Sequence, residues 1–520
     1  MRPATAAYTR RRPEDTVLHR LVREHYATFV AHTEATYAAP VPRYVTEAFE
    51  RYLACGDFSR GFVRCHCDVC RHDVLVAFSC KQRGLCPSCG TRRMCDEAAY
   101  ITDRILPNAP IRQWVLSLPF ELRGLAATKP DVLTALGRVF NIGAEEIARA
   151  TKRLAGVPGA ETGAVSFPQR FGGSLNLHVH FHTLAVDGVF ERDGEDRGRV
   201  HEAPPPARAE VADVVRRVHD SALRWLRRHG YIDERPAEER SNAPAVDAPL
   251  DGLARVALAG GAFLGRPSGP QRPSDEIERK ERRFSASLDG FDVHCAVRIA
   301  AADDEGRERL LRYCARPPFA LERIEEMKDG RVAYLMKAPR RGSTHRVMTP
   351  VEFLGRLAIL VPPPYYPLVR YHGVFAARSS WRALVTPKPP PGATWPKKSK
   401  PCPAAPPTTP PLASAPSNPA PVRPSSNPLP ALPAMPASPS SQSPPGTAPS
   451  AAHALPTAEG DPTTITIRHW NRILDGALFA SSSRVDWAVL MQRTFGFDAL
   501  KCPKCDRRCA SSRPSPSPST

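Results

Sequence analysis

Eight of the fourteen cysteines in this 520-residue chain lie between Cys55 and Cys95, and this clustering constrains the fold more than any other feature. No apolar segment of the secretory type follows the charged N-terminus, so we expect the chain in the cytoplasm. Thiols stay reduced in that compartment and disulfides are rare, so clustered cysteines indicate metal binding. The sequence therefore predicts a small, metal-stabilised domain near the N-terminus.

Two closely spaced cysteine pairs predict the metal and its ligands. Each pair has the form Cys-x2-Cys, and fifteen residues separate the pairs, a spacing typical of zinc held by four thiolates at about 2.3 Å. The predicted zinc ligands are Cys67, Cys70, Cys86 and Cys89. Other donors nearby could replace one of them or hold a second ion, and these are Cys55, Cys65, Cys80, Cys95, His66 and His72.

A third pair of the same form, Cys502 and Cys505, lies near the C-terminus. Cys509 follows closely, but three cysteines do not complete the usual four ligands. This pair therefore belongs to a partial site, to a site completed by a residue elsewhere in the chain, or to a vestige of one.

The positive charge of the chain favours a polyanionic partner. The formal net charge is +19 and the pI is about 9.6. Nucleic acid is the leading candidate, because each phosphate that a lysine or arginine neutralises releases counterions. The candidate DNA-binding residues surround the cysteines and are Lys81, Arg83, Arg92 and Arg93. The alternative is that zinc only stabilises a subdomain that makes no contact with DNA.

A proline-rich segment divides the chain. Of the 57 prolines, 25 lie between Pro387 and Pro462, among alanine, serine and threonine, a composition that buries too little apolar surface to fold. We predict a helical and zinc-binding domain at 1–105, a larger domain at 106–385, a disordered linker at 386–462 and a small segment at 463–520. No run of eighteen apolar residues occurs, so we expect no membrane-spanning helix.

Hydrophobic periodicity predicts an α+β fold around a mixed or antiparallel sheet, because strand patterns are joined both by short turns and by helical patterns. The expected helices lie at 19–51, 130–150, 207–228 and 304–315, with another beginning at 349. The expected strands lie at 114–118, 164–171, 175–186, 291–299 and 331–336.

Three histidines alternate with apolar residues in one predicted strand, so His178, His180 and His182 share a face. Neighbours on that face are about 6.5–7 Å apart at Cα, and two such imidazoles can share an ion. His178 and His182 are about 13 Å apart, too far to share one directly. The ligand pair is therefore His180 with either His182 or His178. Imidazole suits zinc or manganese, and phosphodiester chemistry suits magnesium or manganese.

These motifs together resemble those of the zinc-binding, rolling-circle transposases of the insertion sequence 91 family. The matching segments run in the family's order and are Ser79–Cys89, Trp114–Pro119, Gln169–Asn176, Arg312–Arg316, Arg370–Gly373 and Leu500–Cys505. The resemblance implies a fold of the HUH-endonuclease type (histidine, hydrophobic residue, histidine), with a central sheet, flanking helices and a preceding zinc-binding domain. His180-Phe181-His182 fits the HUH motif.

The resemblance also implies a mechanism. The nucleophile would be Tyr313, and a catalytic Mg²⁺ or Mn²⁺ would be held by His180 and His182, with Gln169 as a third ligand. Some members carry a second tyrosine four residues earlier, where this chain has Arg309, so it resembles a single-tyrosine enzyme. Such an enzyme cleaves and rejoins single-stranded DNA at the ends of its own mobile element, through a 5′-phosphotyrosine. It would act in the cytoplasm, on the bacterial nucleoid.

Two other functions fit the same residues. A histidine-metal hydrolase would turn over a small substrate and form no protein–DNA adduct. A non-catalytic, zinc-dependent DNA-binding protein would keep its affinity for DNA after loss of His180 and His182.

Overall fold

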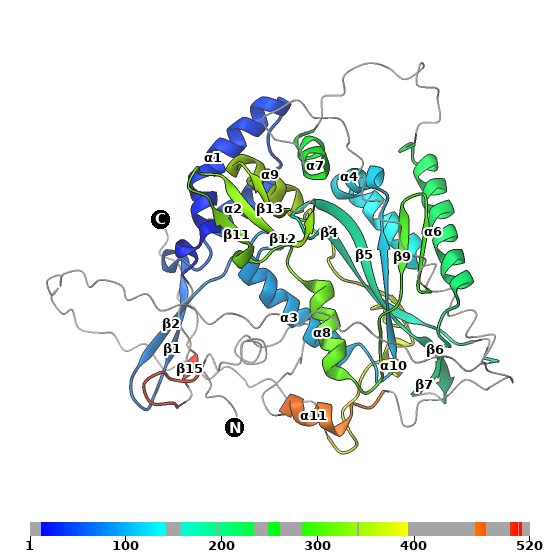
Figure 1. The fold of residues 1–520 in the computed structure, drawn as a ribbon. Helices are drawn as coiled ribbons and strands as arrows, with labels where there is room; N and C mark the ends of the chain where they lie inside the picture. Colours follow the sequence, from blue (N-terminus) through cyan, green and yellow to red (C-terminus); the bar gives the residue numbers. More distant parts are fainter. Residues whose placement is uncertain are drawn as a thin grey trace, which may run out of the picture. The chain divides into compact units, whose positions relative to one another are not determined.

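The main sheet of the protein has seven strands, and the helices cover both of its faces (Figure 1). The computed structural model describes residues 12–141, 156–157, 159–194, 197–232, 248–259, 283–340, 343–393, 463–474, 500–507 and 509–511. Within these ranges the chain is an α+β protein with antiparallel sheets, as predicted.

Strands of the main sheet follow the order β14-β4-β5-β3-β9-β8, and β10 also pairs with β3. All of these pairings are antiparallel. The strands are β3 (Ile111–Ser117), β4 (Gly163–Phe171), β5 (Leu177–Val186), β8 (Ser285–Leu288), β9 (Phe291–His294), β10 (Arg298–Ile299) and β14 (Arg370–Gly373).

Strand β5 lies between β3 and β4 and carries the three histidines. Its register places His180 opposite Ser117 of β3 and opposite Gln169 of β4. Because side chains alternate along a strand, the histidines face one side of the sheet while Val179 and Phe181 face the other. Val179 and Phe181 are buried in the larger hydrophobic core, so packing on that side fixes which face the histidines occupy.

Two helices, α3 (Pro87–Arg104) and α8 (Asp304–Ala315), pack on each other and cover the histidine-bearing face. The opposite face is covered by α4 (Phe120–Thr128), α6 (Arg208–Arg228), α7 (Pro249–Ala259), α9 (Pro350–Leu360) and helical residues 130–141. Helix α1 (Val17–Tyr37) packs on α9 and on α2 (Arg43–Leu53).

Capping residues set where two of the helices begin. Asp303 accepts a hydrogen bond from the backbone N–H of Gly306 at 2.8 Å and starts α8. Thr349 caps α9 by accepting from the N–H of Glu352, with Pro350 in the first turn. The predicted starts of both helices are confirmed.

Two predicted elements prove to be divided. The helix expected at 19–51 is two helices, α1 and α2, because Ala38 takes a left-handed conformation with φ of 48° and ends α1. The strand expected at 291–299 is interrupted after β9 and resumes as β10. Residues 142–150 of another predicted helix lie outside the described residues.

Three smaller sheets flank the main one. The first, in the order β15-β1-β2, consists of β1 (Phe62–His66), β2 (Asp73–Ala77) and β15 (Ala510–Ser511). The others are β6 (Gly188–Asp193) with β7 (Arg197–Glu202), and β11 (Ile324–Glu326) with β12 (Val332–Arg340) and β13 (Ser343–Met348). The short helices are η1 (Pro13–Asp15), η2 (Phe58–Arg60), η4 (Leu321–Arg323), α10 (Arg382–Val385) and α11 (Ile467–Leu474).

Residues near the C-terminus return to the folded part of the chain. Strand β15 pairs with β1, and Lys388 forms a bridge with Thr464. The first residues of the predicted linker, 386–393, therefore belong to the folded structure, and 394–462 lie outside the described residues. Among the helices that are described, none combines the length and the apolar character needed to cross a membrane.

Candidate active site and metal centres

Cysteine sulfurs gather in two separate clusters within the described ranges, so the predicted grouping of four ligands is wrong. One cluster contains Cys55, Cys80, Cys86 and Cys89, and the other contains Cys67, Cys70, Cys502 and Cys505. In each cluster the sulfurs lie within 4.8 Å of one another. The β1–β2 hairpin explains the division. Cys67 and Cys70 lie at its turn, whereas the cluster that contains Cys86 and Cys89 lies at its open end. Five residues of strand span about 16 Å, too far for one ion.

The first cluster joins the start of α3 to the loops on either side of the hairpin. Cys55 Sγ lies 3.8 Å from Cys86 Sγ and 3.9 Å from Cys89 Sγ, and Cys80 Sγ lies 3.6 Å from Cys89 Sγ. Hydrogen bonds from the neighbouring thiols lower the pKa of Cys89, which favours the thiolate that zinc binds. These four residues have the chemistry of a structural zinc site.

The second cluster is made of two pairs from opposite ends of the chain. Cys67 Sγ lies 3.4 Å from Cys505 Sγ, and Cys70 Sγ lies 3.4 Å from Cys502 Sγ. Of the alternatives for the C-terminal pair, the structure selects a site completed elsewhere in the chain. Spacing alone could not identify this partner, since 432 residues separate Cys70 from Cys502.

Histidines 180 and 182 are both buried on the α8 side of the sheet, with exposed fractions of 7% and 3%. Their ring centroids are 4.9 Å apart, and those of His178 and His180 are 4.8 Å apart. Burial, together with the charge of nearby Arg316, lowers the pKa of His180 to about 4 and that of His182 to about 2. Both imidazoles are therefore neutral at pH 7, the form that binds a metal ion.

Helix α8 places Tyr313 against this pair. The tyrosine ring meets the ring of His182 edge-on, with centroids 5.4 Å apart. The guanidinium carbon of Arg316 lies 4.6 Å from the centre of the tyrosine ring, and Lys337 Nζ lies 5.7 Å from it. A half-buried phenol, a neutral histidine pair and two cations thus meet in one place, an arrangement that suits a negatively charged substrate.

Two glutamines connect the histidines to α8. Gln169 donates from Nε2 to the carbonyl oxygen of Cys314 at 2.6 Å and of Tyr313 at 3.3 Å, and so satisfies the last turn of the helix. Gln113 Nε2 lies 2.9 Å from His182 Nδ1. Gln169 was predicted from the sequence as a ligand, whereas Gln113 was not, because its only signal is its place on the histidine-bearing face of β3.

Two buried polar atoms at this place could hold a cation, His182 Nε2 once the amide of Gln113 is turned so that its oxygen accepts from Nδ1. His182 Nε2 and Gln169 Oε1 have no hydrogen-bond partner among the residues that the structure describes. An unsatisfied buried polar atom is costly, and coordination by a divalent cation would satisfy both. His180 Nδ1 contacts the carbonyl oxygen of His178 at 2.9 Å, which leaves its Nε2 for a ligand role.

A basic cleft of about 570 Å³ runs beside the first cysteine cluster and reaches Ala315, the last residue of α8. Its lining includes all four predicted DNA-binding residues, Lys81, Arg83, Arg92 and Arg93, and the aromatic rings of Tyr100 and Tyr371. Arg83 has a structural role as well, because its guanidinium donates to the carbonyl oxygens of Tyr366 and Pro363. Asp96 and Glu97 also line the cleft, which thus combines an excess of positive charge with rings on which bases can stack.

Comparisons with known proteins agree with this arrangement. A family described as "Transposase zinc-binding domain" matches residues 21–118, and one described as "Putative transposase" matches residues 163–382. A putative transposase of Sinorhizobium fredii, y4qJ, is 24% identical over 326 residues, which are 60% of this chain and 69% of that protein. No solved structure gives a significant match. The two matched regions follow each other in the order of the cysteine-rich and histidine-bearing parts described above, and the chain therefore belongs to the insertion sequence 91 family of transposases.

Proposed function

We propose that this transposase cleaves and rejoins single-stranded DNA through a covalent tyrosine intermediate, at the ends of the mobile element that encodes it. The observation that carries the proposal is the edge-on contact of Tyr313 with buried His182, beside Arg316 and Lys337. We further propose that the antiparallel sheet with His180-Phe181-His182 on a central strand is an HUH-endonuclease fold, in which α8 carries the nucleophile.

A divalent cation, Mg²⁺ or Mn²⁺, would be held by His180, His182 and Gln169, and it would stabilise negative charge developing on the phosphate oxygens. Burial keeps both imidazoles neutral, so they do not repel the cation. Gln169 holds the carbonyl groups of the last turn of α8, so one residue fixes both the cation site and the position of the nucleophile. Arg316 and Lys337 add positive charge for the scissile phosphate.

The chemical step is a transesterification. The phenol oxygen of Tyr313 forms a bond to phosphorus, the bond from phosphorus to the 3′-oxygen of the preceding nucleotide breaks, and that oxygen takes up a proton in place of the one that the phenol loses. The product is a 5′-phosphotyrosine and a free 3′-hydroxyl. Attack by a 3′-hydroxyl reverses the step, so the strand is rejoined without ATP. Arg309, one turn before Tyr313, is exposed and offers no second nucleophile.

The basic cleft supplies a path for the strand. Lys81, Arg92 and Arg93 would neutralise phosphates, and Tyr100 and Tyr371 would stack on unpaired bases. Because Ala315 lines the cleft, a strand lying in it would approach the end of α8 on which Tyr313 lies.

The first test is Tyr313→Phe with labelled single-stranded element ends and Mg²⁺ or Mn²⁺, followed on a denaturing gel. The covalent protein–DNA adduct should disappear, while the midpoint of thermal unfolding changes little, because one oxygen is lost and no packing volume. Tyr334→Phe is the matched control, since that ring is fully buried and its variant should keep the adduct. An adduct of undiminished yield in Tyr313→Phe would disprove the assignment. Turnover without any adduct in the wild-type protein would favour the hydrolase.

A further inference from the structure

The N-terminal and C-terminal cysteine pairs share one backbone geometry. In the first pair the N–H of Cys67 donates to the carbonyl oxygen of His72, and the N–H of Arg71 donates to that of Cys67. In the second pair the N–H of Cys502 donates to the carbonyl oxygen of Arg507, and the N–H of Asp506 donates to that of Cys502. Arg71 and Asp506 both take the left-handed conformation, with φ of 61° and 60°. The chain thus builds the same metal-binding turn twice, 435 positions apart as counted from Cys67 to Cys502.

The two turns face each other at the distance that a shared ion requires. Zinc with four thiolates at about 2.3 Å has sulfurs about 3.8 Å apart along each edge of the tetrahedron. The two sulfur pairs that cross between the turns are 3.4 Å apart, and all four sulfurs lie within 4.8 Å of one another. Cys67 and Cys502 are fully buried.

The surroundings of the cluster also come from both ends of the chain. Strand β15 extends the β1–β2 hairpin, with Cys65 opposite Ser511. A small hydrophobic cluster around the sulfurs combines Val63 and Val74 of the hairpin with Leu500 and Cys509 of the C-terminal segment. Because this cluster is small, it can hold the two ends together only weakly without the ion.

We propose that Cys67, Cys70, Cys502 and Cys505 form a second zinc site, distinct from that of Cys55, Cys80, Cys86 and Cys89, and that this zinc ion anchors the C-terminal segment to the N-terminal hairpin. Zinc binding to such a site supplies folding free energy directly, since the ligands come together only in the folded state. The proposal does not depend on the nuclease activity.

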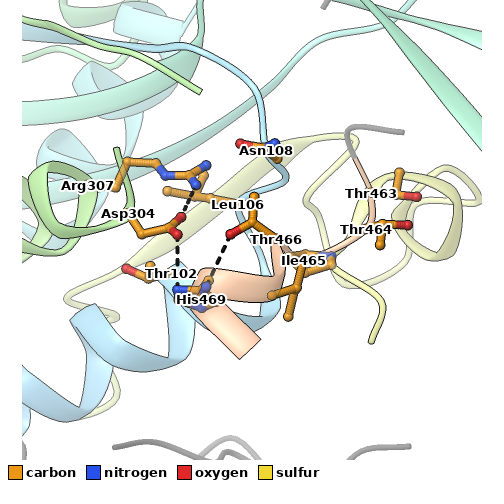
Figure 2. Close-up of a pocket in the computed structure, with 11 residues that line it drawn as sticks. Thr102, Leu106, Asn108, Asp304, Arg307, Thr463, Thr464, Ile465, Thr466 and His469 are labelled. Carbon is orange, nitrogen blue, oxygen red and sulfur yellow. Dashed lines mark hydrogen bonds and ion pairs between the residues drawn. The ribbon is translucent and has the colours of Figure 1, made fainter. Parts of the chain in front are cut away.

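A second contact of the same segment lies at the nucleophile-bearing helix. Figure 2 shows His469, at the start of α11, pointing to Asp304, the first residue of α8, which also pairs with Arg307. His469 Nε2 lies 3.0 Å from Asp103 of α3, so the imidazole lies between the buried carboxylate of Asp103 and the partly buried one of Asp304. The zinc site would therefore hold in place a segment that also contacts α3 and α8.

Metal content of the full-length chain tests the proposal without any activity measurement. We expect two zinc ions per chain in the wild type and one in Cys502→Ser with Cys505→Ser. Cys295→Ser is the control, a buried cysteine outside both clusters, and should keep two. When Co²⁺ replaces zinc, the double variant should show about half of the thiolate–cobalt absorption of the wild type. The absorption that remains would show that the first site is still folded. Two ions in the double variant, or one in the wild type, would overturn the proposal.

A protease site inserted between residues 401 and 454 tests the anchoring role. After cleavage, the C-terminal fragment should co-elute with the rest of the zinc-loaded chain. It should dissociate at least about tenfold more readily when Cys502 and Cys505 are serine, since the zinc-derived binding free energy is lost. Equal retention in both proteins would show that zinc does not anchor the segment.

Discussion

His182 makes two contacts and has one buried atom without a partner, and these three features bear on what the site can do. Gln113 lies at its Nδ1, Tyr313 meets its ring edge, and its Nε2 is buried without a hydrogen-bond partner among the described residues. In the orientation present here the amide nitrogen of Gln113 donates to Nδ1. A half-turn of the amide, which occupies the same space, would let its oxygen accept a proton from Nδ1 and leave the lone pair of Nε2 for a cation. Gln113 is thus placed to select the tautomer of His182.

Gln113→Leu should therefore raise the Mn²⁺ concentration needed for half-maximal cleavage by about 10–100-fold, because a residue that orients a metal-binding histidine typically has an effect of that size. Gln113→Glu keeps an acceptor at Nδ1 and should restore most of the affinity for Mn²⁺. If Gln113 served packing alone, the leucine variant should instead keep a higher affinity for Mn²⁺ than the glutamate variant, since leucine suits a buried position better than a carboxylate. Titration of cleavage with Mn²⁺ distinguishes the two.

At the scale of elements, α8 is held at both of its ends. Gln169 of β4 binds the carbonyl oxygens of its last turn, and His469 of α11 contacts Asp304 in its first turn. Burial alone would lower the pKa of His469, but its hydrogen bonds to Asp103 and Asp304 outweigh burial and raise it. Burial of Asp304 is likewise outweighed by His469 and Arg307, which lower its pKa to about 2. Both shifts indicate an imidazolium held by carboxylates.

The contact of His469 with Asp103 and Asp304 should stabilise the protein in a limited pH range. A raised pKa in the folded state means that the contribution of His469 is complete below its ordinary pKa of 6.5 and is lost as the pH rises through the raised value. The contribution of Asp304 is present above 3.8 and is lost as the pH falls towards about 2. His469→Ala should therefore cost about 1.5–3 kcal/mol of unfolding free energy near pH 6, and less at pH 9. Urea unfolding of both proteins at the two pH values checks this, and a cost independent of pH would contradict it.

At the scale of the whole molecule, local and distant pairings differ in how well the sequence predicts them. The alternation along 175–186 predicted β5 and the shared face of its histidines, and capping residues marked the starts of α8 and α9, because both signals are local. The zinc ligands were grouped wrongly, since spacing favours the nearest pair and carries no information about a partner 432 residues away. Gln113 was missed for a related reason, because only the pairing of β3 with β5 brings it to His182.

Because the net charge is +19, basic side chains over the whole surface contribute to the salt dependence of DNA binding. The cleft accounts for only a part of that dependence. Replacing Lys81 and Arg93 with glutamine should weaken binding of single-stranded DNA. It should also reduce the slope of log affinity against log salt by about 1.4, since each lost phosphate contact removes about 0.7 on a single strand. Arg199→Gln, at an exposed position of β7 outside the cleft, is the control. A slope that is unchanged in the double variant would place the strand elsewhere.

The shared cysteine site also has a consequence for synthesis of the chain. Cys70 leaves the ribosome 432 residues before Cys502, which at about 5–20 residues per second is a delay of roughly 20 to 90 s. During that time the hairpin carries two thiols whose partners do not yet exist, whereas the cluster of Cys55 and Cys89 can close early. Only a chain translated as far as Cys505 can complete the second site. A transposase shortened by a premature stop before Cys502 would then keep the proposed nuclease residues and lack this closure.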